Sequence, residues 1–315
     1  MRLWAAVLLA LVAAALVLGG CDRETKKTTE SRTAVSVDAS GAATTAAGHD
    51  SYASANIGAL RYVPAGTFQR DAIETNTSAV SAFRISQHEI TRAQYVAVMG
   101  AGSDPSDTTY SGGTDDPVQR ANWYQAIAFC NKLSLAESLE PAYGVSGVDF
   151  ATLTYADIPI TSSAVWDAVA ADWSASGYRL PTEMEWMWAA IGAAAGTTGY
   201  AKAFSGSTGG NAVGDYAWTY ENSQINNKSQ PVGTKLANEL GLFDMSGNVW
   251  EWTWDWYGTY PSGALTDYRG ADPSGLRVAH GGSWFNDASF AAPAFRHHSS
   301  PDSQNHRVGF RVVRP

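Results

Sequence analysis

The chain has 315 residues, which is long enough for two average domains or for one large mixed domain with a terminal extension. Its net charge of −9 and its pI of about 5.1 exclude the basic face that a nucleic-acid-binding protein requires, so no nucleic-acid partner is expected. Hydrophobic residues make up 45 % of the chain, which is ample for a core, and most of the 12 tryptophans follow Trp123.

The first 20 residues have the pattern of an export signal. Arg2 precedes an uninterrupted apolar run at residues 3–18, which is shorter than the roughly 20 residues that a membrane-spanning helix needs. The sequence Leu18-Gly19-Gly20-Cys21 resembles the lipobox of bacterial lipoproteins, in which the signal is cleaved and the new N-terminal cysteine is acylated. An ordinary signal peptide with a chance cysteine is the alternative. We expect residues 1–20 to be a lipoprotein signal peptide and Cys21 to carry lipid.

Residues 21–56 are rich in threonine, serine and alanine and lack the periodicity of helices or strands, which predicts a flexible tether. From residue 57 onward, short apolar runs are broken by glycine, proline and asparagine, so one domain is expected over residues 57–315. If Cys21 carries lipid, Cys130 is the only other cysteine, and no disulfide can form within the chain. Stability must therefore come from packing.

Three stretches of the domain have the pattern of helices. Residues 91–100 begin at a capping threonine and end at glycine. Residues 122–138 place Cys130 on a broad apolar face, which predicts a core thiol rather than a nucleophile. Residues 182–191 begin with a capping box of Thr182 and Glu185 and end before Gly192. The rest, especially beyond Trp218, is expected to be loop and short strand.

An ordered set of motifs resembles the formylglycine-generating-enzyme (sulfatase-modifying factor) family. They include YVPAGTF early in the domain, GLFDMSGNVWEW in its second half and GGSW near its end. The resemblance implies an α+β domain with the C-type lectin-like fold of the formylglycine-generating-enzyme type and much irregular structure. The motifs occupy residues 62–68, 88–95, 117–134, 178–186, 238–252, 281–284 and 309–311.

Four tryptophans alternate along one of these motifs, at positions 250, 252, 254 and 256. A strand here would place all four indoles on one face, with Glu251 and Asp255 on the other.

In catalytic members of the family a calcium ion is held around this motif. The resemblance implies that the matching ligands are the Asp244 and Glu251 carboxylates and the Gly247 and Val249 carbonyl oxygens, hard donors that suit Ca²⁺. The family's other calcium site falls in a region that is shortened here, around residues 222–228, so the fit remains open. A structural calcium is the only cofactor expected, and none is required.

Catalytic members also use two cysteines shortly after the GGSW motif, where thiolates hold Cu(I). Counted from Gly281, these positions are Asn286 and Ala291 here, so we expect neither oxidase chemistry nor any catalytic residue. His280 and His306 lie near the pair His297-His298, as in iron-dependent relatives. Adjacent histidines on a strand point to opposite faces, however, which favours ligand-contact histidines over a metal site.

Residues 285–307 (FNDASFAAPAFRHHSSPDSQNHR) contain no lysine, glutamate or methionine. They resemble the variable region of diversity-generating-retroelement target proteins of the treponemal variable protein type, in which randomised asparagine codons cannot yield those residues. Gln304 is an exception, and Arg296, Pro301, Asp302 and residues 309–311 match the fixed frame. The resemblance implies a varied, exposed and ligand-binding role for Phe285, Asn286, Asp287, Ser289, Phe290, Phe295, His297, His298, Ser299, Ser300, Ser303, Asn305 and His306.

Aromatic side chains that supply rigid contact area, together with serine, asparagine and histidine, are also the composition of antibody paratopes. The alternative is that Phe290 and Phe295 are core residues and that the polar residues are a solvated loop.

The leading hypothesis is a monomeric lipoprotein, anchored in the cell envelope at the outer-membrane surface, that binds a protein or glycan ligand without catalysis. One alternative is a divergent metal-dependent oxidase of the sulfatase-modifying-factor type in the cell envelope. The other is an accessory envelope lipoprotein without a diversified site.

Overall fold

The computed structural model describes residues 35–37, 43–45, 52–194, 199–224 and 226–315, which fall into two compact units, Met1–Gly48 and His49–Pro315. The predicted signal peptide and Cys21 lie outside the described residues. In the first unit β1 (Val35–Val37) pairs antiparallel with β2 (Ala43–Thr45), although the sequence predicts no strand there. Among the described residues, no helix has the length and apolar character needed to cross a membrane.

The second unit begins with an antiparallel sheet in the order β15-β7-β4-β3. Its strands are β3 (Tyr52–Ser54), β4 (Gly58–Val63), β7 (Phe83–Ser86) and β15 (Val313–Arg314). Strand β3 lies within the range predicted as tether, so the ordered domain starts several residues earlier than the sequence indicates. Tyr52 is fixed there because its hydroxyl donates a hydrogen bond to Glu137 at 3.1 Å.

A second sheet, in the order β13-β12-β10-β14, carries the C-terminal part of the chain. Its strands are β10 (Trp250–Trp256), β12 (Arg277–His280), β13 (His297–Ser299) and β14 (Val308–Gly309), of which only β14 runs parallel to its neighbour. A third sheet joins β5 (Gly66–Gln69), β6 (Thr77–Val80) and β11 (Leu265–Thr266), and β8 (Tyr143–Gly144) pairs with β9 (Ala170–Ala171).

The three predicted helices are present as α1 (Arg92–Met99), α2 (Trp123–Ala136) and α4 (Glu183–Ala190). Each begins after a residue that closes a capping box, namely Thr91, Asn122 and Thr182. Cys130 is fully buried in α2, as predicted. Short turns of helix complete the unit, at α3 (Ala164–Asp167), α5 (Tyr220–Ser223), η1 (Thr108–Tyr110), η2 (Tyr155–Asp157), η3 (Gly199–Ala201), η4 (Val213–Asp215) and η5 (Ala288–Ala291).

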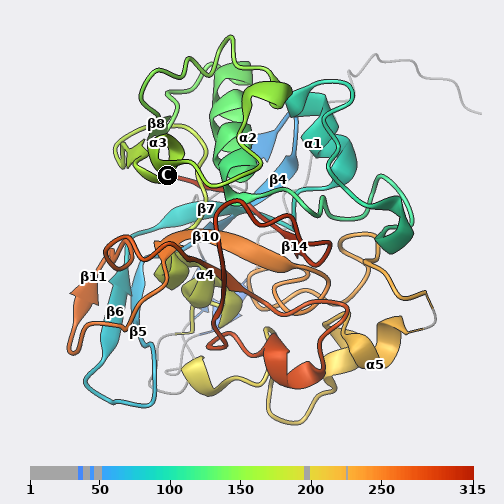
Figure 1. Ribbon diagram of the computed structural model, residues 1–315. Helices are drawn as coiled ribbons and strands as arrows, with labels where there is room; N and C mark the ends of the chain where they lie inside the picture. The colour runs from blue at the N-terminus through green and yellow to red at the C-terminus, as the bar shows by residue number, and fades with distance from the viewer. Residues whose placement is uncertain (1–34, 38–42, 46–51, 195–198, 225) are drawn as a thin grey trace, which may run out of the picture. The chain divides into compact units, whose positions relative to one another are not determined.

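Strand β10 is the centre of this unit, with α2 on one side and α4 on the other (Figure 1). The Trp252 indole is fully buried toward α2 and donates to the Ala121 carbonyl oxygen at 3.0 Å. Glu251 points to the other side, where its carboxylate accepts from the Trp186 indole of α4 at 2.6 Å. The predicted alternation is therefore correct, but both faces of the strand are interior.

A tight loop sets the start of β10. Gly247 has a φ of +80°, and a Cβ at this position would lie 2.3 Å from the Trp218 carbonyl oxygen. Asp244 and Asn248 also have positive φ values, of 56° and 57°. Only glycine fits at position 247, because the backbone of another segment passes directly against it.

Candidate functional site

The predicted variable segment, residues 285–307, is attached at both ends to the sheet that contains β10. Before it, β12 pairs with β10, and after it β14 pairs with the other edge of β10. Within the segment, η5 lies beside α5 (Figure 1), and the Ala288 backbone N–H donates to Glu221 at 3.2 Å. Strand β13 adds the middle of the segment to the sheet through β12. The segment is therefore a long, mostly irregular connection whose two ends are held by strands of one sheet.

Arg296 fixes the middle of the segment to α4. Its guanidinium bonds both carboxylate oxygens of Glu183, at 2.6 and 2.9 Å, and His280 bonds the same carboxylate at 2.8 Å. Burial opposes ionisation of Glu183, but the hydrogen bond and charge of His280 and the charge of Arg296 outweigh it and lower the pKa of that carboxyl. The frame position predicted for Arg296 thus corresponds to a buried ionic anchor.

The buried residues of the segment all lie outside the predicted varied positions, although most of the other unvaried positions are half-buried, as many varied ones are. Ala291, Pro293 and Pro301, none of them predicted to vary, are buried. None of the thirteen predicted ligand-binding positions is buried. Exposed are Phe285, Asp287, Ser289, Phe295 and His298, and half-buried are Asn286, Phe290, His297, Ser299, Ser300, Ser303, Asn305 and His306.

One group of these side chains surrounds Trp250 at the start of β10. The Trp250 ring lies 6.3 Å from Phe290, 5.9 Å from Phe295 and 4.8 Å from His297, measured between ring centroids. Its indole N–H donates to Asn286 at 2.9 Å. Trp250 itself is 4 % exposed, so it forms the floor of this aromatic cluster. Phe290 packs partly against the core, so its side chain also contributes to the packing of the domain, which that of Phe295 does not.

A second group lies around Trp284 and brings together the two ends of the segment. The His306 ring stacks on Tyr110 at 4.0 Å and lies 6.0 Å from Trp284. Phe285, which is 45 % exposed, packs edge-on against Trp284 at 5.4 Å and Tyr220 at 6.1 Å. Burial, followed by the charge of Arg307, lowers the pKa of His306, so its imidazole is neutral at pH 7.

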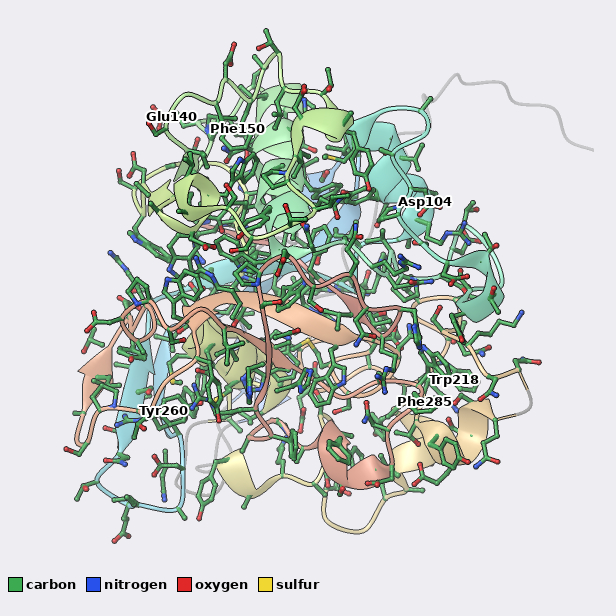
Figure 2. The ribbon with its side chains drawn as sticks, in the orientation of Figure 1. Asp104, Glu140, Phe150, Trp218, Tyr260 and Phe285 are labelled. Atoms are coloured by element: carbon green, nitrogen blue, oxygen red, sulfur yellow. The ribbon has the colours of Figure 1, made fainter. Side chains whose placement is uncertain are left out.

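The two adjacent histidines of β13 contact different neighbours, but their own rings also stack with centroids 6.0 Å apart, so they are not fully separated to opposite faces of the strand as the sequence predicts. His297 lies against Trp250, whereas His298 lies 4.1 Å from the Tyr257 ring. Tyr257 also lines a hollow of about 730 Å³ together with Tyr260. Figure 2 shows Tyr260 and Phe285 on opposite sides of the view, and Ala294 and Arg296 of the segment line the hollow beside Tyr260. Among the described residues, no group of three or more histidine, cysteine, aspartate or glutamate side chains could hold a metal ion.

The Glu251 carboxylate, predicted to be a calcium ligand, is bound by other groups. Arg311 donates to both of its oxygens at 2.6 Å, and the Trp186 indole donates to one of them. This arrangement does not fit a calcium ion held by Glu251, because a buried bidentate ion pair already uses both oxygens. Asp244 keeps one buried oxygen without a partner in the described part of the chain. Calcium held by Asp244 with the Gly247 and Val249 carbonyl oxygens remains a prediction.

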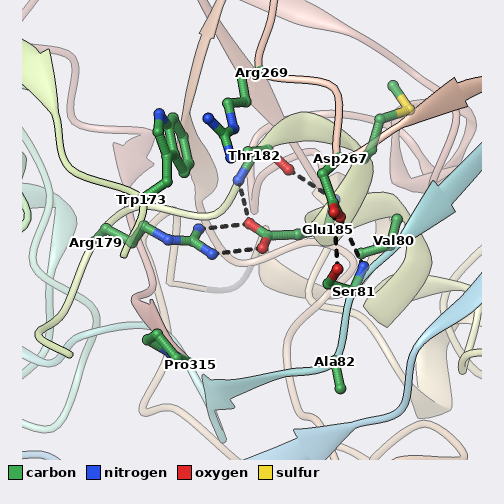
Figure 3. A pocket seen from close by; sticks show the side chains of 11 residues that line it. Val80, Ser81, Ala82, Trp173, Arg179, Thr182, Glu185, Asp267, Arg269 and Pro315 are labelled. Atoms are coloured by element: carbon green, nitrogen blue, oxygen red, sulfur yellow. Dashed lines mark hydrogen bonds and ion pairs between the residues drawn. The ribbon is translucent and has the colours of Figure 1, made fainter. Parts of the chain in front are cut away.

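Another hollow, of about 230 Å³, lies beside the start of α4 (Figure 3). Its polar groups bind one another. Arg179 forms a two-bond ion pair with Glu185, and both carboxylate oxygens of Asp267 accept from Ser81 at 2.8 Å. Arg269 lies over the Trp173 ring at 4.3 Å. This hollow presents few groups that still need a partner, which distinguishes it from the surface around Trp250.

Sequence reasoning missed Trp250, Trp284, Tyr110 and Tyr220 as parts of this surface. The alternating tryptophans predict a buried strand, and no local signal indicates that the first of them supports a loop about forty residues later. Tyr110 and Tyr220 belong to separate connections, so only the assembled fold brings them to the segment.

Comparison with known proteins agrees with this architecture. A chaperone protein, LppX, of Paenibacillus barcinonensis is 32 % identical over 271 residues, which are 81 % of this chain and 89 % of that protein. A formylglycine-generating enzyme of Mycobacterium tuberculosis is 29 % identical over 296 residues, 82 % of this chain and 93 % of the enzyme.

Among solved structures, Treponema denticola variable protein 1 is 36 % identical, with a TM-score of 0.75, and the match covers 84 % of this chain and 99 % of that one. The predicted C-type lectin-like fold of the formylglycine-generating-enzyme type is confirmed by this match. Residues 49–315 match the model of the sulfatase-modifying factor enzyme 1-like domain, and the chain belongs to that family.

Proposed function

We propose that this protein is a lipid-anchored envelope protein that binds a ligand, without catalysis, through a diversified surface formed by residues 285–307. The carrying observation is the exposure pattern of the segment. All thirteen positions assigned to ligand binding keep contact with solvent, while Ala291, Pro293 and Pro301 are buried. Such a pattern is what a site needs if its contact residues change while its fold stays constant.

The similarity to Treponema denticola variable protein 1 supports a variable surface, because it extends over 99 % of that chain at 36 % identity. Exposed phenylalanines support binding as well. Phe285 and Phe295 are 45 % and 36 % exposed, and each extends an aromatic group of the segment to the solvent, which is the kind of exposed apolar surface that supports an interaction site.

The absence of catalysis rests on Asn286 and Ala291, the positions assigned to the copper-binding cysteines. An amide and a methyl group supply no thiolate for Cu(I). The Asn286 amide oxygen already accepts from Trp250 and Ser283, and Ala291 is buried. The residues present therefore do not fit a copper site. Because formylglycine-generating enzymes are among the relatives, a metal-dependent oxidase is the competing function, and stoichiometric copper or iron in the purified protein would favour it.

We favour a protein over a glycan as the ligand. The aromatic cluster around Trp250 offers apolar contact area of the kind that anchors protein interfaces. The Paenibacillus relative carries the name of a chaperone, which also points to a protein partner.

Lipidation at Cys21 and display at the outer-membrane surface complete the proposal. Mass spectrometry of the mature protein tests the anchor, since an acylated Cys21 adds the mass of lipid that a Cys21→Ala variant lacks. An unmodified Cys21 would contradict the lipid anchor, and the protein would then be a binding protein that is secreted or attached in another way.

The binding surface is tested by selecting peptides from a displayed random library on the full chain. We expect the Phe295→Ala, His298→Ala double variant to lose the selected peptides while its melting temperature changes little, because both side chains are exposed. Ile160→Ala, which removes an apolar side chain that is 60 % exposed and lies outside the segment, is the matched control and should keep them. Peptides that bind the double variant as well as the original would contradict the proposed site.

Diversification has a separate genomic test. We expect an adjacent reverse-transcriptase gene and a near-copy of the coding sequence for residues 281–311 that differs only at template adenines. A genome with neither would remove diversification from the proposal.

A further inference from the structure

A small hollow of about 160 Å³ opens in the variable surface beside Trp250. It is lined by Trp250, Asn286, Phe290, His297, Asn305 and Arg307. Its chemistry is decided by which hydrogen-bonding groups of the lining residues already bind other parts of the protein.

Asn286 lines the hollow with its acceptor oxygen already engaged. Its side-chain oxygen accepts two hydrogen bonds, from the Trp250 indole N–H at 2.9 Å and from the Ser283 hydroxyl at 2.6 Å. Its amide NH₂ group has no partner in the described part of the chain. Because the acceptor side of the amide is saturated, only the donor side is available to a ligand.

Asn305 is arranged in the same way. Its side-chain oxygen accepts from the Arg307 backbone N–H at 3.0 Å and from the Arg307 Nε at 3.4 Å. Over the residues that the structure describes, its amide NH₂ group is also unpartnered. Two amides therefore line the same hollow, each with its oxygen engaged and its NH₂ group unused by the described residues.

Arg307 adds an uncompensated positive charge. Its guanidinium lies 4.9 Å from the centre of the Phe285 ring, but within the described ranges no carboxylate pairs with it and its two terminal nitrogens form no hydrogen bond. By contrast, Arg296 and Arg311 form ion pairs with Glu183 and Glu251. Burial, followed by the charges of His298 and Arg307, lowers the pKa of His297, which keeps that ring neutral at pH 7.

We propose that this hollow binds a carboxylate, presented by an aspartate or glutamate side chain of the protein partner, with Arg307 as the charged donor and the Asn286 and Asn305 amides as neutral donors. This inference rests on the proposed function and specifies its ligand. Charge-assisted hydrogen bonds to a carboxylate are stronger than neutral ones. Trp250 and Phe290 supply apolar walls for the methylene groups that carry the carboxylate.

Arg307 is not among the positions assigned to variation, although its neighbours Asn305 and His306 are. A preference for acidic groups would therefore persist while the surrounding contacts change. The surface would combine a constant anchor with variable contacts that select among acidic partners.

The direct test uses N-acetylglutamate amide as the probe, titrated into the isotope-labelled full chain and followed through the side-chain amide resonances of Asn286 and Asn305. We expect saturable shifts with this probe and none with N-acetylglutamine amide, which has the same shape without the charge. Arg307→Gln should weaken binding by about tenfold or more, whereas Arg307→Lys should retain part of it because the charge remains. Arg269→Gln, which removes an exposed cation in another hollow, is the control and should bind normally.

Absent shifts with N-acetylglutamate amide, or equal shifts with the glutamine analogue, would overturn the inference. Stronger binding of glucuronate than of the amino-acid probe would overturn the assignment to a protein side chain. Thermal melting of the Arg307 variants establishes that they fold.

Selected peptides separate this inference from the proposed function. We expect them to be enriched in aspartate and glutamate and to be lost on Arg307→Gln. Peptides that need Phe295 and His298 but are not acidic, and that tolerate Arg307→Gln, would refute the carboxylate site and leave the binding function intact. Failure of every peptide to depend on Phe295 and His298 would refute the function itself.

Discussion

Replacing Asp244 with asparagine should stabilise the protein at neutral pH. Asp244 is 2 % exposed, and one of its oxygens accepts from the Gly233 backbone N–H at 2.7 Å while the other has no partner among the described residues. Burial raises the pKa of this carboxyl from its usual 3.8 to about 6, against the opposing effects of the Gly233 hydrogen bond and the Arg311 charge. The nearby Glu251 charge raises it further.

The sign of the pH dependence follows from proton binding. A carboxyl group whose pKa is higher in the folded state holds its proton more tightly there. Below about pH 4 the group is largely protonated in both the folded and the unfolded state, so it does not lower the free energy of unfolding. The free energy of unfolding then falls as pH rises toward 6 and levels off above it. A shift of about two pKa units corresponds to roughly 3 kcal/mol.

Asn fits the site in other respects. Its side-chain oxygen can accept from the Gly233 N–H, and asparagine tolerates the φ of 56° at this position better than most residues. Asp244→Asn should therefore match the original protein near pH 4 and exceed it by about 2–3 kcal/mol at pH 7.5.

Urea unfolding of both proteins between pH 4 and 8, with a chelator present, measures this difference. Asp272→Asn removes an exposed carboxylate and should change stability by less than about 0.5 kcal/mol at any of these pH values. An Asp244→Asn protein that is no more stable than the original at pH 7.5 in chelator would refute the reasoning. A loss of stability seen only with calcium added would instead identify Asp244 as a calcium ligand.

Three further predictions follow from packing and from the loop before β10. Trp250→Ala should lower the free energy of unfolding by about 3–5 kcal/mol, measured by urea denaturation, because the indole is only 4 % exposed. The same variant should lose peptide capture. A change below about 1 kcal/mol would mean that the neighbouring side chains fill the space left by the indole. Gly247→Ala should not yield a folded protein by circular dichroism, because its Cβ would lie 2.3 Å from the Trp218 carbonyl oxygen, whereas Gly263→Ala, with the same sign of φ and open space, should fold. Calorimetry with calcium after chelation should show heat if Asp244 binds the ion, and no heat together with no thermal shift would eliminate that site.

The parts of the fold that depend on local chemistry could be predicted from the sequence. Thr91, Asn122 and Thr182 begin the three main helices because a capping side chain and its partner three residues later satisfy the first backbone N–H groups. The alternation along β10 is equally local, since neighbouring side chains of a strand must point to opposite faces.

The parts that depend on long-range pairing could not be predicted in the same way. Arg311 lies 60 residues from Glu251, and nothing near either residue indicates that they form an ion pair instead of a calcium site. Strand β3 has too little periodicity in its three residues to be predicted, and its place is set by Glu137, the residue that caps the C-terminus of α2. The thirteen surface positions follow from the resemblance of residues 285–307 to a variable region, which indicates the residues that can vary but not that Trp250 supports them.

The contact between Arg296 and Glu183 ties the middle of the variable segment to α4, and the two halves of the segment on either side of it meet again over one indole. Phe290 from the first half and His297 from the second half both contact Trp250. Substitutions in the two halves are therefore coupled through shared contacts, and their effects on stability should not simply add. For a protein engineer, the segment would serve as a single library in which both halves are randomised together, while position 296 and the buried prolines are kept.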